Sequence, residues 1–381
     1  MNKPNRGDLL RLGAGALAAA YGLEAPAAAA TYKKPAGWDK LVEAANQEGS
    51  LVLYGPPTIN GMYEALATRF MRAYPNIKVT GNFAFGNALL TRIQAERAGG
   101  RYLPDAIVIG SSVLLLGLKP SGALQPLEPL LMLPEILDPS AWFQNELWWT
   151  DAKRPNANYM FEGEMIPPAY YNTNLAKASD FHSYWDIADA KWKGKIAAND
   201  IRANGPGGVP ARFIFNNSTL GRPWLERFFG RLDVRLSRDQ RQLVDWLAQG
   251  QCAIAAFIDT DTAQVAIDQG LPIAPINISQ LREGGAVAPD GGTVSVPDRV
   301  PHPNAAKLYV NWLLSRDGQT AWQEETKTPS LRTDLPKQDL HLMSAARKNY
   351  TFANGGAEKY VSTGTALAAA VTSILQSAGR S

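Results

Sequence analysis

The sequence predicts an α/β fold built as two domains. From Leu41 onward, short apolar strands alternate with amphipathic helices, which is typical of sheets flanked by helices. A length of 381 residues exceeds what one hydrophobic core usually supports and suits two domains of ordinary size. The composition, 45% hydrophobic and 19% charged, is that of a folded soluble protein, and 33 glycines and 26 prolines punctuate the chain.

The first domain is expected to open with three short apolar strands. They are residues 51–54, 77–79 and 106–109. A helix between the first two strands is indicated by Met62, Leu66 and Phe70, which are spaced four residues apart. In an open α/β sheet the ligand crevice lies beyond the carboxyl ends of the strands. The candidate ligand-binding residues there are Pro57, Thr58, Gly86, Asn87, Ser111 and Ser112.

The second domain is expected to begin near Ile166, after an aromatic-rich stretch over residues 139–164. Its expected strands are residues 169–172, 195–197 and 252–258, and a further strand follows at 291–296. Ser237 with Gln240 predicts a capping box at the start of a helix that Gly250 ends. A last helix opens at Pro303 and turns these residues inward: Ala305, Leu308, Tyr309, Trp312 and Leu313.

The N-terminus has the features of a signal peptide. Lys3, Arg6 and Arg11 precede an apolar stretch over residues 12–20, and a tract of small residues at 25–30 offers Ala-x-Ala cleavage frames. A continuous apolar span of the length that crosses a membrane is missing from this stretch. We therefore expect removal of residues 1–30 and a periplasmic location. A twin-arginine signal lacks its second arginine here, where Gly7 stands, so the Sec and twin-arginine routes both remain open.

Several function classes are disfavoured by composition and spacing. The formal net charge of +3 includes no Lys/Arg block dense enough for a nucleic acid backbone. Cys252 is the single cysteine and lies in an apolar run, which predicts a buried small hydrophobe. His182, His302 and His341 lie far apart without metal or triad spacing. The chain also lacks a nucleophile elbow and a phosphate-cradling lysine loop, so we predict no enzyme, no cofactor and no resident metal.

Five segments, in this order along the chain, carry a family resemblance: residues 49–54, 169–175, 184–186 with 192–196, 301–307 and 328–332. They resemble segments of bacterial extracellular solute-binding proteins of ATP-driven (ABC) importers, especially the branch that binds ferric ion. The resemblance implies a type II periplasmic-binding-protein fold with two lobes joined by hinge strands. It assigns residues 31–165 plus 285–335 to lobe 1, and 166–284 plus 336–381 to lobe 2. The hinge would run near residues 167–172 and 291–296.

The same resemblance implies a non-catalytic, monomeric receptor that binds one small molecule between its lobes and delivers it to an importer permease in the inner membrane. A receptor that only signals would share this fold. Ferric-ion binders of this branch carry adjacent tyrosines after the strand equivalent to residues 252–258. The chain instead reads Asp259, Thr260, Asp261 and Thr262. Because phenolates hold ferric iron, an anionic organic solute is favoured, with ferric iron or a ferric chelate as the alternative.

A glycine-rich loop with an arginine is the most informative candidate site of the second domain. Arg202 lies beside glycines whose backbone N–H groups are accessible, and its guanidinium suits a carboxylate or phosphate. We therefore expect Arg202 to anchor an anionic group. The further candidate ligand-binding residues are Tyr170, Asn204, Gly207, Asp259, Thr260, Asp261 and Asp290. Tyr170 and Tyr171 point to opposite faces of one strand, so at most one of them faces a ligand.

Overall fold

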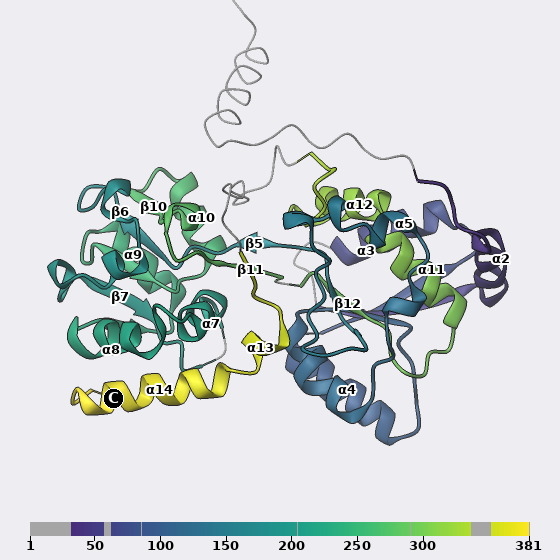
Figure 1. Cartoon of the computed structure of the whole chain (residues 1–381), viewed down its shortest axis with the longest axis horizontal. Helices are drawn as coiled ribbons and strands as arrows, with labels where there is room; N and C mark the ends of the chain where they lie inside the picture. The colour runs from purple at the N-terminus through teal and green to yellow at the C-terminus, as the bar shows by residue number, and fades with distance from the viewer. Residues whose placement is uncertain are drawn as a thin grey trace, which may run out of the picture. The chain divides into compact units, whose positions relative to one another are not determined.

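The computed structural model describes residues 32–56, 62–84, 86–203, 205–289, 291–336 and 352–380. These residues form two compact units. Unit 1 contains the described residues up to Glu164, those from Pro289 to 336, and Gly356–Glu358. Unit 2 contains Met165–Ala288, residues 352–355, and the described residues from Lys359 onward. Each unit contains a five-stranded sheet with helices packed on it, which confirms the predicted α/β class (Figure 1).

The sheet of unit 1 has the strand order β2-β1-β3-β12-β4. The strands are β1 (Ser50–Gly55), β2 (Lys78–Phe83), β3 (Ala106–Val108), β12 (Thr293–Ser295) and β4 (Tyr159–Met160). β1 runs parallel to β2 and β3, whereas β12 is antiparallel to β3 and β4. The carboxyl ends of β1, β2 and β3 therefore meet at one edge of the sheet, as the sequence predicts.

The helices of unit 1 are α2 (Trp38–Glu48), α3 (Met62–Ala73), α4 (Gly86–Ala98), α5 (Pro134–Leu137), α11 (Pro303–Leu314) and α12 (Arg316–Thr326). Of these, α3, α4 and α11 pack on the strands, while α2 and α12 pack on α11. Leu89 and Ile93 of α4 pack in one core cluster with Tyr54 and Ile107 of the strands. The expected inward face of α11 is confirmed, since Leu308, Tyr309 and Leu313 are fully buried, and Tyr309 packs edge-on against Phe70 of α3.

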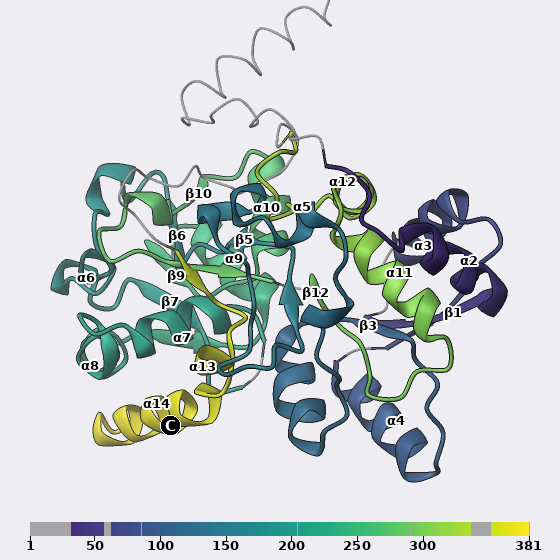
Figure 2. The ribbon, with the colours of Figure 1, turned by 45° about the vertical axis from the view of Figure 1, so that its right-hand side comes forward.

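The sheet of unit 2 has the strand order β10-β6-β9-β7-β8. The strands are β6 (Ala169–Asn172), β7 (Ile196–Asn199), β8 (Arg235–Ser237), β9 (Ile254–Ala256) and β10 (Ile273–Pro275). The helices are α6 (Tyr184–Ile187), α7 (Gly208–Asn216), α8 (Gly221–Arg231), α9 (Gln240–Ala248), α10 (Thr260–Asp268) and α14 (Gly364–Ser377). α9 packs on the sheet, while α14 packs against α8 (Figure 2).

A three-stranded sheet, β13-β11-β5, lies where the chain passes from one unit to the other. Its strands are β5 (Glu164–Met165), β11 (Ala286–Ala288) and β13 (Ala353–Asn354). Unit 1 ends at Glu164 within β5, and it resumes at Pro289, directly after β11. The short helix α13 (Glu358–Val361) spans another such passage. The first two passages lie a few residues before the segments 167–172 and 291–296, which contain β6 of unit 2 and β12 of unit 1.

The start of α9 differs from the prediction. The residue that caps α9 is Asp239, whose carboxylate accepts a hydrogen bond from Gln242 N at 3.1 Å. Ser237, the predicted cap, ends strand β8, and its hydroxyl donates to the side chain of Gln242. The predicted capping box was therefore wrong by two residues. Ser237 pairs as the last residue of strand β8, and Asp239, which directly precedes α9, serves as the N-cap.

Buried side chains explain two other sequence features. Cys252 is buried as predicted, and this burial raises the pKa of its thiol to about 11. In the aromatic stretch, Trp142 and Trp148 are buried, and their indole N–H groups donate to backbone carbonyls of Ile136 and Phe143. These tryptophans therefore pack within unit 1. Among the described residues no helix has the length and apolar character that crossing a membrane requires.

Candidate ligand-binding site

Two loops of unit 2 meet at the carboxyl ends of neighbouring strands. β7 and β9 are parallel partners, so the residues that follow them emerge at the same edge of the sheet. The loop after β7 runs to α7, and the loop after β9 runs to α10. These two loops hold most of the candidate residues that the sequence assigns to the second domain. We call this region the β7/β9 edge.

Gly207 allows the loop after β7 to pack closely against the loop after β9. Its φ of 75° is in the left-handed region, and a Cβ at this position would collide with both Cβ and the carbonyl oxygen of Phe257. Phe257 itself has a φ of 59°. The amide of Asn199 donates to the carbonyl of Pro206 at 2.8 Å and fixes the same loop from the other side. Only glycine satisfies both constraints at position 207.

Asp200 forms ion pairs with two arginines. Arg202 donates from Nε to Oδ1 at 2.8 Å and from Nη2 to Oδ2 at 3.1 Å, and Arg238 reaches Oδ2 at 3.0 Å. Burial acts to raise the pKa of Asp200, but the hydrogen bonds from Arg202 and Arg238 outweigh it and lower that pKa below its ordinary value. The fork of Arg202, the predicted ligand anchor, is thus occupied by a carboxylate of its own unit.

Arg212 lies one turn into α7 and has no such partner. Its Nε is buried and makes no hydrogen bond in the described part of the chain. Desolvation lowers the pKa of its guanidinium, and no neighbouring carboxylate counteracts this effect. A Cβ on Gly208 would lie 2.9 Å from Nη1 of Arg212, so the guanidinium folds back over the first residue of α7. α7 also begins without a side-chain cap at Gly207.

Arg212 is not among the residues that the sequence predicts for the site. The signal that points to it is composition, because Arg212 is the one charged residue in the α7 sequence GVPARFIFN. A single arginine in an apolar helix is paired, faces solvent or is available to a ligand. Which of these holds depends on the tertiary neighbours, and the sequence does not reveal them.

Asp259, Thr260 and Asp261 open helix α10. The carboxylate of Asp259 accepts hydrogen bonds from the backbone N of Thr262 at 2.9 Å and from its hydroxyl at 2.6 Å. Asp259 is therefore the N-cap of α10, and Asp261 is an exposed residue of its first turn. The carboxylate of Asp259, a candidate ligand-binding residue, is therefore used by the fold to begin a helix. Over the described ranges, no three His, Cys, Asp or Glu side chains gather as a metal site would require.

The remaining candidates lie in unit 1, in the core of unit 2, or outside the described residues. Gly86 begins α4, with Asn87 exposed beside it, and Ser111 is buried whereas Ser112 is exposed. Tyr170 is 2% exposed and packs in the core of unit 2 with residues of α9. The candidates outside the described residues are Pro57, Thr58, Asn204 and Asp290. Of the whole set, the structure brings Arg202, Gly207 and the Asp259–Asp261 turn to the β7/β9 edge.

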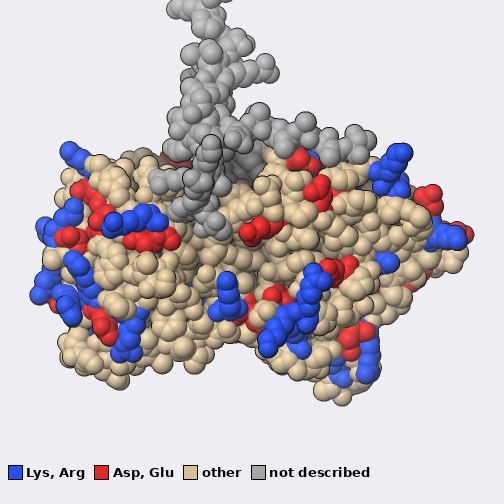
Figure 3. Space-filling model, viewed as in Figure 1, with Lys and Arg blue, Asp and Glu red and all other residues tan. Residues whose placement is uncertain are grey.

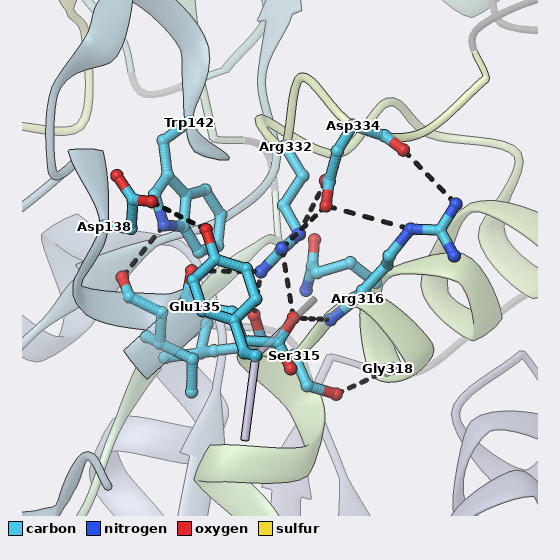
Figure 4. Close-up of polar contacts among 12 residues, drawn as sticks. Glu135, Asp138, Trp142, Ser315, Arg316, Gly318, Arg332 and Asp334 are labelled. Atoms are coloured by element: carbon cyan, nitrogen blue, oxygen red, sulfur yellow. Dashed lines mark hydrogen bonds and ion pairs between the residues drawn. The ribbon is translucent and has the colours of Figure 1, made fainter. Parts of the chain in front are cut away.

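Arg332, in the family-like segment 328–332, is part of a structural network in unit 1. It has no exposed surface, and its guanidinium donates to both carboxylate oxygens of Asp334 at 2.9 Å (Figure 4). Its Nη2 also lies 3.1 Å from Glu135, and the guanidinium lies 5.4 Å from the ring centre of Trp142. Every nitrogen of this guanidinium has a partner, so Arg332 connects α5 and α11 to the loop that follows α12.

The match to a family model spans residues 55–320, well over half of the chain, and the family is described as bacterial extracellular solute-binding protein. The chain therefore belongs to the family of bacterial extracellular solute-binding proteins. A search of curated protein sequences returns no match.

Solved structures share the fold at low sequence identity. A putative extracellular solute-binding protein from Bordetella parapertussis has a TM-score of 0.65 and 13% identity, over 86% of this chain and 99% of that one. The Trichodesmium protein IdiA (FutA), in complex with iron and citrate, has a TM-score of 0.61 and 18% identity, covering 87% and 100%. The periplasmic binding protein AfuA from Actinobacillus pleuropneumoniae, with fructose-6-phosphate bound, has a TM-score of 0.52 and 19% identity, covering 84% and 97%. These likenesses confirm the predicted two-lobed α/β fold of periplasmic binding proteins.

Proposed function

We propose that this protein is the periplasmic solute-binding component of an ABC importer and that it captures a small anionic organic solute. The family match over residues 55–320 carries the proposal, because members of this family bind solutes outside the cytoplasm. The basic, apolar and small-residue features of residues 1–30 support export with removal of that segment. The protein binds its solute unchanged and passes it to a permease in the inner membrane.

The proposed mechanism is closure of the two units around the solute. Closure excludes water, which strengthens every polar contact made to the ligand. The chain passes between the units at Glu164–Met165 and at Ala288–Pro289, and we assign the hinge to these two passages. A hinge needs only a few residues whose backbone dihedral angles change on closure. Unit 1 contributes the loops after its parallel strands, with Pro57, Thr58, Gly86, Asn87, Ser111 and Ser112. Unit 2 contributes the β7/β9 edge, and Asp290 follows the second passage directly in sequence.

The arginines near the β7/β9 edge favour an anion. Arg202 and Arg238 share the single carboxylate of Asp200, and Arg212, in the helix that follows β7, has no carboxylate partner among the described residues. On the face of the molecule shown in Figure 3, basic and acidic side chains are interspersed. Two proteins of the same fold have been solved with ligands that carry carboxylate or phosphate groups, citrate with iron in one and fructose-6-phosphate in the other. The unbalanced arginines and these two ligands support an anionic organic solute.

A ferric chelate is the second candidate, because one of those structures holds iron with citrate. Bare ferric iron is disfavoured by the role of Asp259. One carboxylate oxygen of Asp259 is committed to Thr262, and the hydroxyl and carboxylate side chains of residues 259–262 replace the phenolates that hold ferric iron. A purified protein that turns red with stoichiometric ferric iron and keeps it against citrate would contradict this choice.

Native mass spectrometry of protein released from the periplasm tests the proposal. We expect a mature chain that begins near Thr31 and carries one small anionic molecule, which is recovered chemically unchanged. Deletion of the gene should abolish uptake of that molecule. An intact Met1 in the periplasmic protein would contradict export by cleavage. Unchanged uptake combined with a lost signalling response would favour a receptor that only signals.

A further inference from the structure

Arg212 is a charged group that the described chain leaves without a counter-charge. Its Nε is buried and has no hydrogen-bond acceptor, and no ion pair involves its guanidinium within the described ranges. The side chain is partly exposed, so the cost in folding free energy comes from its buried Nε and the partial desolvation of the charge, and an anion bound there would offset that cost. A side chain kept in this state in unit 2 therefore indicates an external partner.

The surroundings of Arg212 fit an oxyanion. The guanidinium lies over Gly208, which has no side chain to block access, and its Nη1 would be only 2.9 Å from a Cβ placed there. α7 is nine residues long and lacks a side-chain cap, and its first residue, Gly208, is the one that the guanidinium approaches. A planar arginine fork pairs with two oxygens of a carboxylate or phosphate at once.

We infer that Arg212, rather than Arg202, binds the anionic group of the solute, and that this group is a phosphate monoester or a carboxylate. This inference rests on the proposed function as a solute-binding protein. Arg202 is held by both oxygens of Asp200, so an incoming anion would have to compete with a carboxylate that is already in place. Arg212 binds the anion without breaking any described contact.

The test uses mature protein with the substitutions Arg212→Met, Arg212→Lys and Arg202→Met. Arg222→Met serves as the matched surface control, because Arg222 is an exposed partner of Glu226 on α8. The probes are glucose 6-phosphate beside glucose, succinate beside its neutral diamide, and the solute recovered from the native protein. Binding is measured by calorimetry, and the melting temperature is measured without any solute.

For the anionic probe that the wild type binds, Arg212→Met should weaken binding about ten- to a hundredfold, because a charge-assisted fork is lost. Arg212→Lys should fall between Arg212→Met and wild type, since it keeps the charge without the fork. Arg202→Met should change affinity by about fivefold at most. Without solute, Arg212→Met should melt about 2–4 °C higher than wild type, because it removes an unpaired, partly desolvated charge with a buried Nε. A purely structural arginine would show the opposite shift.

Two results would overturn this assignment while the proposed function stands. One is equal affinity of wild type and Arg212→Met for the same anion. The other is wild-type binding of the neutral probes or of a neutral recovered solute only. If Arg212→Met fails to fold, Arg212→Lys replaces it in the test. The assignment would then be overturned if Arg212→Lys bound every anionic probe as tightly as wild type does. A wild type that binds no solute and carries none from the periplasm would instead reject the proposed function, and this inference with it.

Discussion

Two arginines of this protein, the fully buried Arg332 of unit 1 and the partly buried Arg212 of unit 2, stand in opposite electrostatic situations. Arg332 is completely buried and its fork is filled by Asp334, by Glu135 and by backbone carbonyls. Arg212 has a buried Nε without any partner in the described chain. Filled pairing is what a residue that holds the fold requires, and under our proposal the missing pairing of Arg212 leaves it available to a ligand.

Among these predictions, loss of the fully paired guanidinium of Arg332 should change the stability of the protein most. Arg332→Met should lower the free energy of unfolding by about 3–5 kcal/mol, because Asp334 and Glu135 would keep buried charge without their main partner. Urea denaturation followed by tryptophan fluorescence measures this loss. Arg69→Met is the control, since Arg69 pairs with Glu324 and Glu325 at the surface and should cost less than about 1 kcal/mol. If Arg332→Met and Arg69→Met lowered the free energy of unfolding equally, the buried pairing of Arg332 would be no more important for stability than the surface pairing of Arg69.

A somewhat smaller loss is expected in unit 2, where Gly207 holds the β7/β9 edge rigid. Gly207→Ala should cost about 2–4 kcal/mol, because it combines a left-handed backbone with a collision against Phe257. Gly270→Ala is the matched control: its φ of 78° is similar, but nothing lies within 4 Å of the added Cβ. That variant should cost only about 1 kcal/mol. A Gly207→Ala protein as stable as Gly270→Ala in urea denaturation would show that the two loops are not locked.

A still smaller change is expected at Asp200, whose pKa is lowered by Arg202 and Arg238 against the opposing effect of burial. A lowered pKa in the folded state means that the unfolded state takes up the proton first as the pH falls. The stability from this group is therefore present above the ordinary value of 3.8 and is lost as the pH falls through the lowered pKa. Asp200→Asn should cost about 1–2 kcal/mol at pH 7.

That cost should shrink toward zero in unfolding experiments carried from about pH 5 to about pH 2. Asp239→Asn is a suitable control, because its N-cap hydrogen bond survives the substitution. A difference between wild type and Asp200→Asn that stays constant over this range would contradict the pairing described for Asp200.

Local pattern was enough to predict much of the fold. The strand at residues 169–172 is β6 to the residue, and the periodicity of Leu66 and Phe70 indicated the buried face of α3, because side-chain spacing alone decides which face is apolar. The edge of the sheet where ligand residues should gather was also predictable, since it follows from the direction of parallel strands.

The assignment of individual site residues was less accessible, because it depends on partners far away or in an unexpected register. Arg202 looked available in a glycine-rich loop, yet Asp200, two residues earlier, takes up its fork. Asp259 appeared as a loop carboxylate, and the fold uses it to cap α10. Arg212 carries no motif, and its importance emerges only when its neighbours in space are known. Pairing in three dimensions is what sequence spacing leaves undetermined.

Whether Arg212 is reserved for a ligand is decided most directly by the free energy of unfolding of Arg212→Met, measured in urea without solute and beside Arg332→Met. We predict that Arg212→Met is more stable than wild type by about 1 kcal/mol, the opposite sign to Arg332→Met, because an unpaired, partly desolvated charge with a buried Nε has been removed. The variant should also lose the stabilisation that an anionic solute gives to wild type. A variant destabilised by several kcal/mol, as expected for Arg332→Met, would show that Arg212 holds the fold and would contradict its assignment to the ligand.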